Sequence, residues 1–381
     1  MKPALKLILI VVLYTATLLQ IPSSTRAHNI NKKWAVLISG FSDPSENMDR
    51  DFSILKSILS TYYGFADSNM FFQLYAISET VHSALTDWLA SRSNYGDLVF
   101  IFIASHGGGY NNRYGRIEGG RIDADGDEGP EVYNATSGKW FGVDECLHFQ
   151  MDRSLYWDDQ MKQDLATIKY GRMIAFIYGC EFENSTENCF SGGFIDDISG
   201  PRRIIVTSGN ETWYSWAAGY PIQRGYFSRY FIDSLDPNSY HFRNADTDGD
   251  GAISVCEAFM YAYQNDPRRT DPINGETPWM DSNGDRRPTF LNGQDQGGHY
   301  EVTYFATQTW LNNSMYTGNV ADVNNDGCVD MADIDQAVAH FGGECDPYAN
   351  QLWDPLVDVN YDNLNDMADI SIIIDQFGWE K

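Results

Sequence analysis

A histidine and two cysteines stand at or just beyond the ends of two strongly apolar segments, where they can carry out nucleophilic chemistry. The run at 97–105 leads directly into His106, and the run at 172–179 leads directly into Cys180. A second cysteine, Cys189, lies nine residues further on, in the motif Cys-Phe-Ser-Gly-Gly. An imidazole beside a cysteine can pair with its thiolate or protonate a leaving amine. The sequence therefore predicts a His/Cys pair, with Cys189 and Cys180 as alternative nucleophiles.

Glycines follow these residues and leave room for a substrate carbonyl to approach the backbone. Gly107 comes directly after His106, and backbone N–H groups near it are suited to stabilise an oxyanion. A structural interpretation stands beside this one. A buried histidine often belongs to the core, and Cys180 and Cys189 can form a disulfide in an exported protein. Counting free thiols distinguishes the two interpretations.

The segment 246–257 matches an EF-hand calcium loop at every position. Oxygen-bearing side chains fall at loop positions 1, 3, 5, 9 and 12, glycine at 6 and an apolar residue at 8. This spacing winds the chain around one calcium ion and begins a helix. The predicted ligands are Asp246, Asp248, Asp250, Ala252 through its backbone, Ser254 and Glu257.

The C-terminal segment contains two more loops of this kind. Segments 322–333 and 358–369 align at a separation of 36 residues, and each precedes an expected helix. Residues 321–381 hold fourteen acidic residues and one basic residue, so we expect this segment to fold on binding two calcium ions. The predicted ligands are Asp322, Asn324, Asp326, Cys328, Asp330 and Asp333 in the first loop, and Asp358, Asn360, Asp362, Leu364, Asp366 and Asp369 in the second. About three calcium ions are expected in all.

Strands and helices alternate in the part of the chain that precedes these loops. Short apolar runs predict strands at 34–40, 71–77, 97–105, 172–179 and 202–209, and amphipathic spacing predicts helices at 47–63, 79–93 and 157–169. This order predicts an α/β fold, a doubly wound and mostly parallel sheet with helices on both faces. Ligands of such sheets bind beyond the carboxyl ends of the strands, where the histidine and cysteines fall.

Composition and the N-terminal segment bound the class of protein. The 381 residues carry a formal charge of −27, which argues against nucleic acid or an anionic membrane as a partner. Residues 1–27 have a positive start, a short apolar run and a small-residue exit, the pattern of a cleaved secretory signal peptide. No later stretch is long and apolar enough to span a membrane. We expect a secreted or extracellular protein, with attachment to a cell surface as an alternative.

The expected organisation has four parts. They are a signal peptide at 1–27, an α/β domain at 28–265 that includes the loop at 246–257, an irregular extension and linker at 266–320, and a calcium-binding module at 321–381.

The strand-end motifs resemble those of the caspase-like cysteine peptidases, which include metacaspases and legumain. The Ser-His-Gly-Gly sequence at 105–108 matches the histidine motif of that family, and the Cys189 motif is similar to the metacaspase pattern Cys-x-Ser-Gly. In these peptidases the nucleophile follows its strand directly, as Cys180 does here. The resemblance covers about residues 33–265. It implies a caspase-like fold and a cysteine endopeptidase of peptide or protein substrates, with His106 as general acid and thiolate partner.

Acidic residues between the motifs carry a further resemblance. Asp144 precedes a glutamate, and Asp158 and Asp159 open an expected helix. These pairs look like the metacaspase pairs that bind an activating calcium, which implies a regulatory calcium site.

The duplicated loops resemble a dockerin, a module that docks into a cohesin on a scaffold or cell surface. In that family, loop positions 10 and 11 contact the cohesin. Here they are Met331-Ala332 and Met367-Ala368, identical in both copies, which implies two equivalent binding poses. The resemblances together imply a secreted endopeptidase tethered through this module. The alternatives are an inactive caspase-like binding protein that acts as a calcium-dependent docking component and, for the module alone, a purely structural calcium-stabilised tail.

Overall fold

The structure of the protein is a computed structural model, and part of the chain is described. The described residues are 32–42, 48–94, 96–108, 110–111, 115–116, 132–134, 139–141, 145–179, 181–182, 191–200, 202–210, 215–269, 275–282, 284, 290–291, 294–295, 306, 309, 311, 321, 323, 328–344, 357, 359 and 364–378. The predicted signal peptide, Cys180, Cys189 and Asp144 lie outside them. Within these ranges no helix has the length and apolarity needed to cross a membrane.

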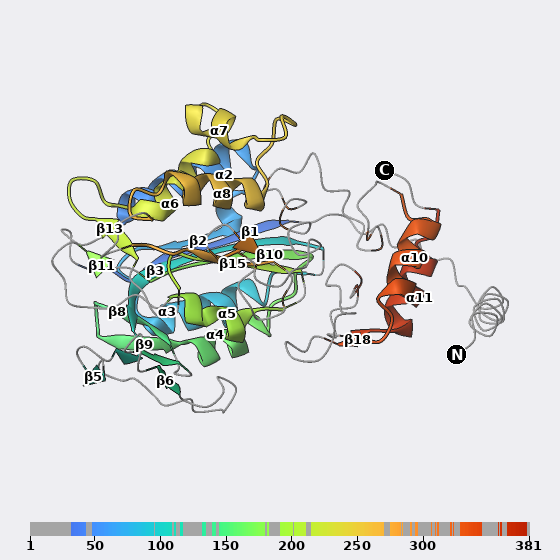
Figure 1. Ribbon diagram of the computed structural model, residues 1–381, viewed down its shortest axis with the longest axis horizontal. Helices are drawn as coiled ribbons and strands as arrows, with labels where there is room; N and C mark the ends of the chain where they lie inside the picture. The colour runs from blue at the N-terminus through green and yellow to red at the C-terminus, as the bar shows by residue number, and fades with distance from the viewer. Residues whose placement is uncertain are drawn as a thin grey trace.

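One large sheet forms the centre of the fold (Figure 1). Its strand order is β17-β16-β15-β12-β10-β3-β1-β2, and the strands from β12 to β2 are parallel. The parallel strands are β1 (Lys33–Ser39), β2 (Met70–Gln73), β3 (Leu98–Gly108), β10 (Arg172–Gly179) and β12 (Arg203–Thr207). The antiparallel strands are β15 (Trp279–Asp281), β16 (Phe290–Leu291) and β17 (Gln294–Asp295). The prediction of a mostly parallel α/β sheet is confirmed.

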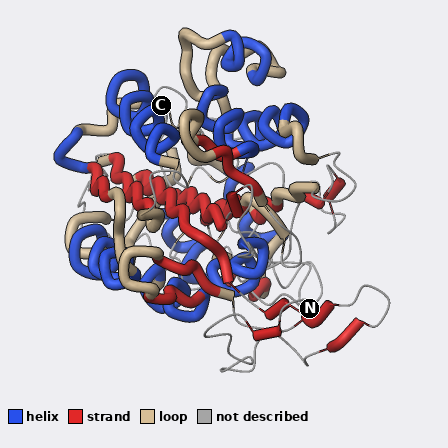
Figure 2. The backbone as a smooth tube through the Cα atoms, turned by 90° about the vertical axis from the view of Figure 1, so that its left-hand side faces the viewer, coloured by secondary structure: helices blue, strands red, loops and turns tan. Residues whose placement is uncertain are grey.

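Helices cover both faces of this sheet (Figures 1 and 2). One face carries α2 (Asp49–Tyr62), α6 (Tyr226–Ser234) and α8 (Val255–Asn265), with α7 (Tyr240–Ala245) beyond them. The other carries α3 (Ser78–Ser83), which continues into a π-helical turn at Ala84–Leu89, and also α4 (Asp158–Leu165) and α5 (Phe194–Ile198).

Alternation along each strand explains why both faces are covered. In β3, Phe100 and Phe102 join the apolar cluster under α2, α6 and α8, whereas Val99 and Ile101 join the cluster on the opposite face. Successive side chains of a strand point to opposite faces, so an uninterrupted apolar run requires a helical layer on each side.

Shorter elements complete the described chain. They are the helical turns at Asp67–Asn69 and Ser191–Gly193, and the strands β4 (Tyr110–Asn111), β5 (Gly115–Arg116), β6 (Val132–Asn134), β7 (Lys139–Phe141), β8 (Cys146–Phe149), β9 (Ser154–Trp157), β11 (Glu181–Phe182), β13 (Trp216–Ala218) and β14 (Arg224–Gly225). Of these, β8 matters most for the site, because it pairs antiparallel with the end of β3 and with β9.

The predicted irregular extension at 266–320 contributes to the sheet. Strand β15 lies within it and pairs with β12, and Met280 belongs to the core. Lys33 Nζ donates a hydrogen bond of 2.5 Å to the carbonyl of Leu311, which also lies in the extension. The interpretation of this whole segment as irregular is therefore wrong for β15, whose three residues are too few to give a recognisable pattern. The predicted domain boundaries stay predictions.

The C-terminal segment has an apolar cluster of its own. Its described helices are α10 (Met331–Ala339) and α11 (Met367–Asp375), and its strands are β18 (Gly343–Glu344) and β19 (Leu364–Asn365). Ile334 of α10 and Ile370 of α11 lie in this cluster with Val323 and Val359. Both expected helices are present, but each begins inside its loop segment, at loop position 10, rather than after it.

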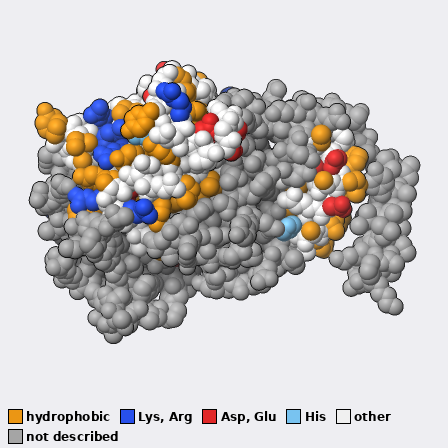
Figure 3. Space-filling view, turned by 45° about the horizontal axis from the view of Figure 1, so that its top comes forward, with side chains coloured by type: hydrophobic (Ala, Val, Ile, Leu, Met, Phe, Trp, Pro, Cys, Tyr) orange, Lys and Arg blue, Asp and Glu red, His pale blue; other side chains and the backbone are white. Residues whose placement is uncertain are grey.

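Charge is distributed unevenly over this acidic chain. Figure 3 views the face over α2, α6 and α8, and the described side chains there include several groups of Lys and Arg beside hydrophobic residues. On α6, Arg229 lies with its Cζ 4.7 Å from the ring centre of Tyr230. Much of the negative charge lies instead in the C-terminal 60 residues.

Gly40 follows β1 at a point where three segments crowd together. A Cβ atom at this position would lie 2.4 Å from Ser105 Oγ and 2.6 Å from Cδ1 of Phe149. Gly40→Ala is therefore expected to lower the free energy of unfolding by about 1–3 kcal/mol, measured by urea denaturation. Gly200→Ala is the matched control, because its Cβ would meet only the side chain of Arg203, at 3.4 Å or more. Equal urea midpoints for the two variants would contradict the close approach.

Candidate functional site

His106 lies at the carboxyl end of β3, where the strand leaves the parallel sheet and pairs with β8. It stands opposite His148 in that ladder and is 1% exposed. Phe41, which follows β1, packs its ring edge-on at 5.2 Å between ring centres. Gln150, just after β8, places its side-chain nitrogen 2.7 Å from His106 Nε2. The imidazole is thus held from two sides by elements distant in the sequence.

The neighbouring strand β10 ends beside Ser105, the residue that precedes His106. Gly179 is the register partner of Ser105. In the sequence these residues are followed by Cys180 and His106, respectively. The predicted pairing of strand ends is therefore consistent with the described register. Gly107 lies one residue further, opposite Leu147 of β8, and its proposed role at the oxyanion stays a prediction.

A chain of buried hydroxyl groups links the residues that flank the two cysteines. Ser208 Oγ donates to the Gly179 carbonyl at 3.0 Å and lies 3.1 Å from Ser191 Oγ. Ser215 Oγ also donates to the Gly179 carbonyl and contacts Ser208 Oγ at 2.8 Å. Cys180 directly follows Gly179, and Cys189 stands two residues before Ser191. The choice between the cysteines stays open.

Asp158 connects the start of α4 to the start of β8. Its buried carboxylate accepts hydrogen bonds from the backbone N–H of Glu145 and, at 2.8 Å, from that of Asp159. The Glu145 carboxylate in turn packs against Gly193, where a Cβ atom would lie 2.0 Å from Glu145 Oε2. Asp158 therefore has a structural role in the described chain. The predicted regulatory calcium site at Asp144, Asp158 and Asp159 stays a prediction.

The loop at 246–257 gathers its acidic side chains around one point. Carboxylate oxygens of Asp246, Asp248 and Asp250 lie within 4.8 Å of one another, the single group of this kind among the described residues. Burial raises the pKa of Asp250, and the charges of Asp248, Glu257 and Asp246 raise it further. Crowded carboxylate oxygens of this kind suit a hard cation such as calcium, which would relieve their repulsion.

Glu257 closes this loop at position 12. Its Oε1 accepts from the Thr247 N–H at 2.8 Å, and its Oε2 accepts from the Ser254 N–H at 2.9 Å. Ser254 also caps α8, because its Oγ accepts from the Glu257 N–H at 3.2 Å. The acid at position 12 thereby joins loop positions 2 and 9.

The two C-terminal loops close in the same way. Asp333 accepts from the N–H groups of Val323 and Asp330, both at 2.8 Å. Asp369 accepts from the N–H groups of Val359 and Asp366, both at 2.9 Å. These again are loop positions 2 and 9, so three loops share one closure. Six predicted ligands lie outside the described residues: Asp322, Asn324, Asp326, Asp358, Asn360 and Asp362.

The residues expected to contact a cohesin occupy equivalent positions in the two copies. Met331 and Met367 begin α10 and α11 and are 55% and 41% exposed. Ala332 and Ala368 follow them and are exposed too. The preceding aspartates, at loop position 9, each cap a helix by accepting the N–H of these alanines, at 2.7 and 2.6 Å.

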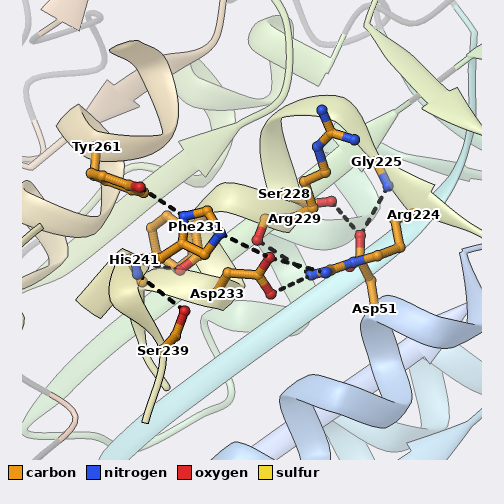
Figure 4. A network of polar contacts seen from close by, with 11 residues as sticks. Asp51, Arg224, Gly225, Ser228, Arg229, Phe231, Asp233, Ser239, His241 and Tyr261 are labelled. Carbon is orange, nitrogen blue, oxygen red and sulfur yellow. Dashed lines mark hydrogen bonds and ion pairs between the residues drawn. The ribbon is translucent and has the colours of Figure 1, made fainter. Parts of the chain in front are cut away.

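A buried ion-pair network, which no sequence pattern predicted, connects α2 to β14 and α6 (Figure 4). Asp51 is fully buried, pairs with Arg224 Nε, and accepts from the Gly225 N–H at 2.9 Å and Ser228 Oγ at 2.7 Å. Arg224 also pairs with Asp233 at 2.8 Å. This network fixes the start of α2, the helix that follows the segment carrying Phe41.

Two buried carboxyl groups meet beneath β10 and β13. Glu276 is 1% exposed, and its Oε1 accepts from Tyr178 OH at 3.3 Å and from the Trp216 N–H at 3.4 Å. A side-chain hydrogen bond joins it to Asp266, the residue after α8. Burial raises the pKa of Asp266 to about 6 and raises that of Glu276 well above its usual range. Burial therefore favours the protonated form of both carboxyl groups.

This pair makes stability depend on pH. Both folded-state pKa values exceed the unfolded values, so the native state holds more protons and stability falls as pH rises from about 4 through 6. Asp266→Asn keeps a hydrogen-bonding partner but removes the repulsion. It is expected to raise the free energy of unfolding at pH 8 by about 1–3 kcal/mol and to change it little at pH 4. Denaturation at both pH values measures this, with the exposed Asp67→Asn as control. Equal shifts at pH 4 and pH 8 would contradict the raised pKa values of this pair.

Comparison with known proteins gives distant matches. No protein-family model and no curated protein matches the chain. Among solved structures, the chain is similar to a structural-genomics target from Geobacter sulfurreducens, with 13% identity and a TM-score of 0.42 over 74% of this chain and 99% of the other. It is also similar to caspase-1 from Spodoptera frugiperda, with 14% identity and a TM-score of 0.39 over the same shares. At this distance neither match carries an argument about activity.

Proposed function

We propose that this protein is a secreted, calcium-binding cysteine endopeptidase with a caspase-like α/β domain and a dockerin-like tail. The observation that carries the proposal is the register of β3 and β10. Ser105 pairs with Gly179 across β3 and β10, and in the sequence these two residues are followed by His106 and Cys180. A histidine and a cysteine at adjacent strand ends suit acyl transfer from a peptide bond.

The proposed reaction uses His106 and one cysteine, Cys189 or Cys180. The thiol gives its proton to the imidazole as sulfur bonds to the substrate carbonyl carbon. Backbone N–H groups near Gly107 stabilise the negative oxygen of the tetrahedral intermediate. The imidazolium then gives the proton to the leaving amine as the C–N bond breaks, which leaves a thioester. Water, deprotonated by the same imidazole, hydrolyses the thioester and restores the thiol.

The test of this function is peptide cleavage by the full chain. The protein, purified in calcium, is incubated with a peptide mixture, and cleaved bonds are mapped by mass spectrometry. New internal cleavages that disappear after thiol alkylation would support an endopeptidase. A protein that contains accessible thiols and yet cleaves no peptide in calcium would contradict it.

Three loops are proposed to hold calcium, one in the α/β domain and two in the tail. The loop at 246–257, which leads directly into α8, would bind an ion through its carboxylates. Asp333 and Asp369 already join two distant backbone positions of their loops, and a bound ion would strengthen that closure. Asp144, Asp158 and Asp159 are proposed as a further, regulatory site.

The tail is proposed to dock into a cohesin on a scaffold or cell surface. The equal placement of Met331-Ala332 and Met367-Ala368 at the starts of α10 and α11 supports this. A module with two equivalent faces would bind its partner in either of two orientations.

One observation favours the alternative function of an inactive, calcium-dependent docking protein. Ser208 contacts both Gly179 and Ser191. The two residues that border the segment 180–190, which carries both cysteines, therefore lie close together. A disulfide between the two cysteines would leave no nucleophile. Thiol counting on the native chain distinguishes the functions, because the peptidase requires at least one accessible thiol of this pair.

A further inference from the structure

Gln150 bridges the end of β1 and the imidazole of His106. Its side-chain Oε1 accepts the Ser42 backbone N–H at 2.7 Å, and its Nε2 lies 2.7 Å from His106 Nε2. Its own backbone N–H donates to the Gly40 carbonyl at 3.0 Å. The side chain is therefore anchored at both ends of its amide and through its main chain.

These contacts determine which ring nitrogen of His106 carries a proton. The Ser42 N–H is a donor, so the amide oxygen of Gln150 must face it and the NH2 group must face the ring. An amide NH2 group donates and does not accept. His106 Nε2 must therefore accept this hydrogen bond, and a ring nitrogen that accepts carries no proton. The neutral imidazole then has its proton on Nδ1.

We propose that Gln150 is a positioning residue that holds His106 neutral, with its proton on Nδ1, in the protein without substrate. The inference rests on the proposed function and adds to it. The resting site would then contain a neutral imidazole and a thiol rather than a preformed thiolate–imidazolium pair. The imidazole becomes charged only during the reaction, when sulfur bonds to the carbonyl carbon and the thiol proton moves to Nε2, the ring nitrogen without a proton, which the Gln150 amide must first release.

Charging the ring requires a change at Gln150. The imidazolium carries N–H groups at both nitrogens, so its Nε2–H would face the amide NH2 of Gln150. A 180° rotation of the amide relieves this conflict, since Oε1 then accepts the Nε2–H. The rotation takes the acceptor away from the Ser42 N–H. The charge of His106 is thereby coupled to the backbone that follows β1.

Other titratable groups also surround the ring. His148 lies opposite it on β8, and Glu145 and Cys146 lie at the start of that strand. On the other side, the segment that follows β1 places the uncharged ring of Phe41 against His106. The candidate cysteines, Cys180 and Cys189, lie outside the residues that the structure describes. The test must therefore follow His106 itself, by residue-specific measurement, rather than a bulk titration.

The test compares the wild-type chain with Gln150→Glu by nitrogen-15 NMR of the histidine rings. In the wild type we expect a neutral His106 at pH 7 with its proton on Nδ1. In Gln150→Glu one carboxylate oxygen accepts the Ser42 N–H and the other accepts a protonated Nε2, so the imidazolium is stabilised. The pKa of His106 is expected to rise by one unit or more. The exposed Gln163→Glu adds the same charge elsewhere and is expected to leave His106 unchanged.

Thiol reactivity gives a second readout. Alkylation by iodoacetamide as a function of pH is expected to begin at lower pH in Gln150→Glu, because an imidazolium stabilises the thiolate. A wild-type His106 that is charged at pH 7, or that carries its proton on Nε2, would overturn the assignment. So would a Gln150→Glu variant whose His106 titrates as in the wild type. If the chain cleaves no peptide but His106 shows the expected tautomer, the endopeptidase proposal fails and the assignment of Gln150 stands.

Discussion

Replacing His106 by alanine is expected to lower kcat/KM for peptide hydrolysis about a hundred- to ten-thousandfold. The imidazole is the proposed acceptor of the thiol proton and the donor to the leaving amine, and a positioned acid–base group contributes a factor of this size. Steady-state hydrolysis of a cleaved peptide identified for the wild type measures the loss. Because His106 is buried against Phe41 and Gln150, circular dichroism must show that the variant is folded.

His148→Ala is the matched control for this prediction. His148 is the register partner of His106 on β8, so it tests removal of an imidazole from the same ladder. This variant is expected to keep its activity within about tenfold of the wild type. A folded His106→Ala variant with wild-type kcat/KM would remove His106 from the mechanism. Equal losses in both variants would indicate a structural effect on the ladder.

Removing calcium is expected to unfold the C-terminal segment of the full chain. Residues 321–381 carry thirteen more acidic than basic side chains, and their small apolar cluster must overcome that repulsion. In EDTA we expect proteolysis within 321–381 to accelerate at least tenfold, with the cleavage sites identified by mass spectrometry. The α/β domain has two large apolar clusters and should remain resistant outside its own calcium loop.

Asp333→Ala tests the same prediction at one residue. It removes the buried carboxylate that accepts from Val323 and Asp330, and with it a proposed ligand. We expect at least tenfold weaker calcium binding, measured by calorimetry. Asp335→Ala on the same helix is exposed and removes the same charge, so it is expected to change binding less than threefold. Equal protease resistance of residues 321–381 with and without calcium would contradict calcium-dependent folding of this segment. Equal effects of Asp333→Ala and Asp335→Ala on calcium binding would contradict it too.

The sequence predicted the central strands well because their signal is local. An apolar run such as 97–105 or 172–179 can be satisfied only between two helical layers, so its burial is visible without a partner. The calcium loops are equally local, since the closure of 246–257 by Glu257 depends on spacing within twelve residues. His106 became a candidate because it directly follows the apolar run at 97–105 in the sequence.

The features that the sequence did not predict depend on contacts between residues far apart along the chain. Gln150 reaches His106 because β8 returns to the end of β3, 44 residues later along the chain. Asp51 and Arg224 are separated by 173 residues, and nothing near either one marks it as half of a buried ion pair. The strand in the extension beyond residue 266 was not predicted, for a different reason. Strand β15 has only three residues, too few for an alternating pattern.

Active-site labelling is the most direct test of whether His106 activates one of the two cysteines. The full chain in calcium is treated with a peptidyl electrophile, beside His106→Ala and His148→Ala, and the adduct is mapped by mass spectrometry. We expect one adduct, on Cys180 or on Cys189, which forms in the wild type and in His148→Ala but more slowly, by about a hundredfold or more, in His106→Ala. Finding Cys180 and Cys189 joined in a disulfide, with neither able to form an adduct, would contradict it.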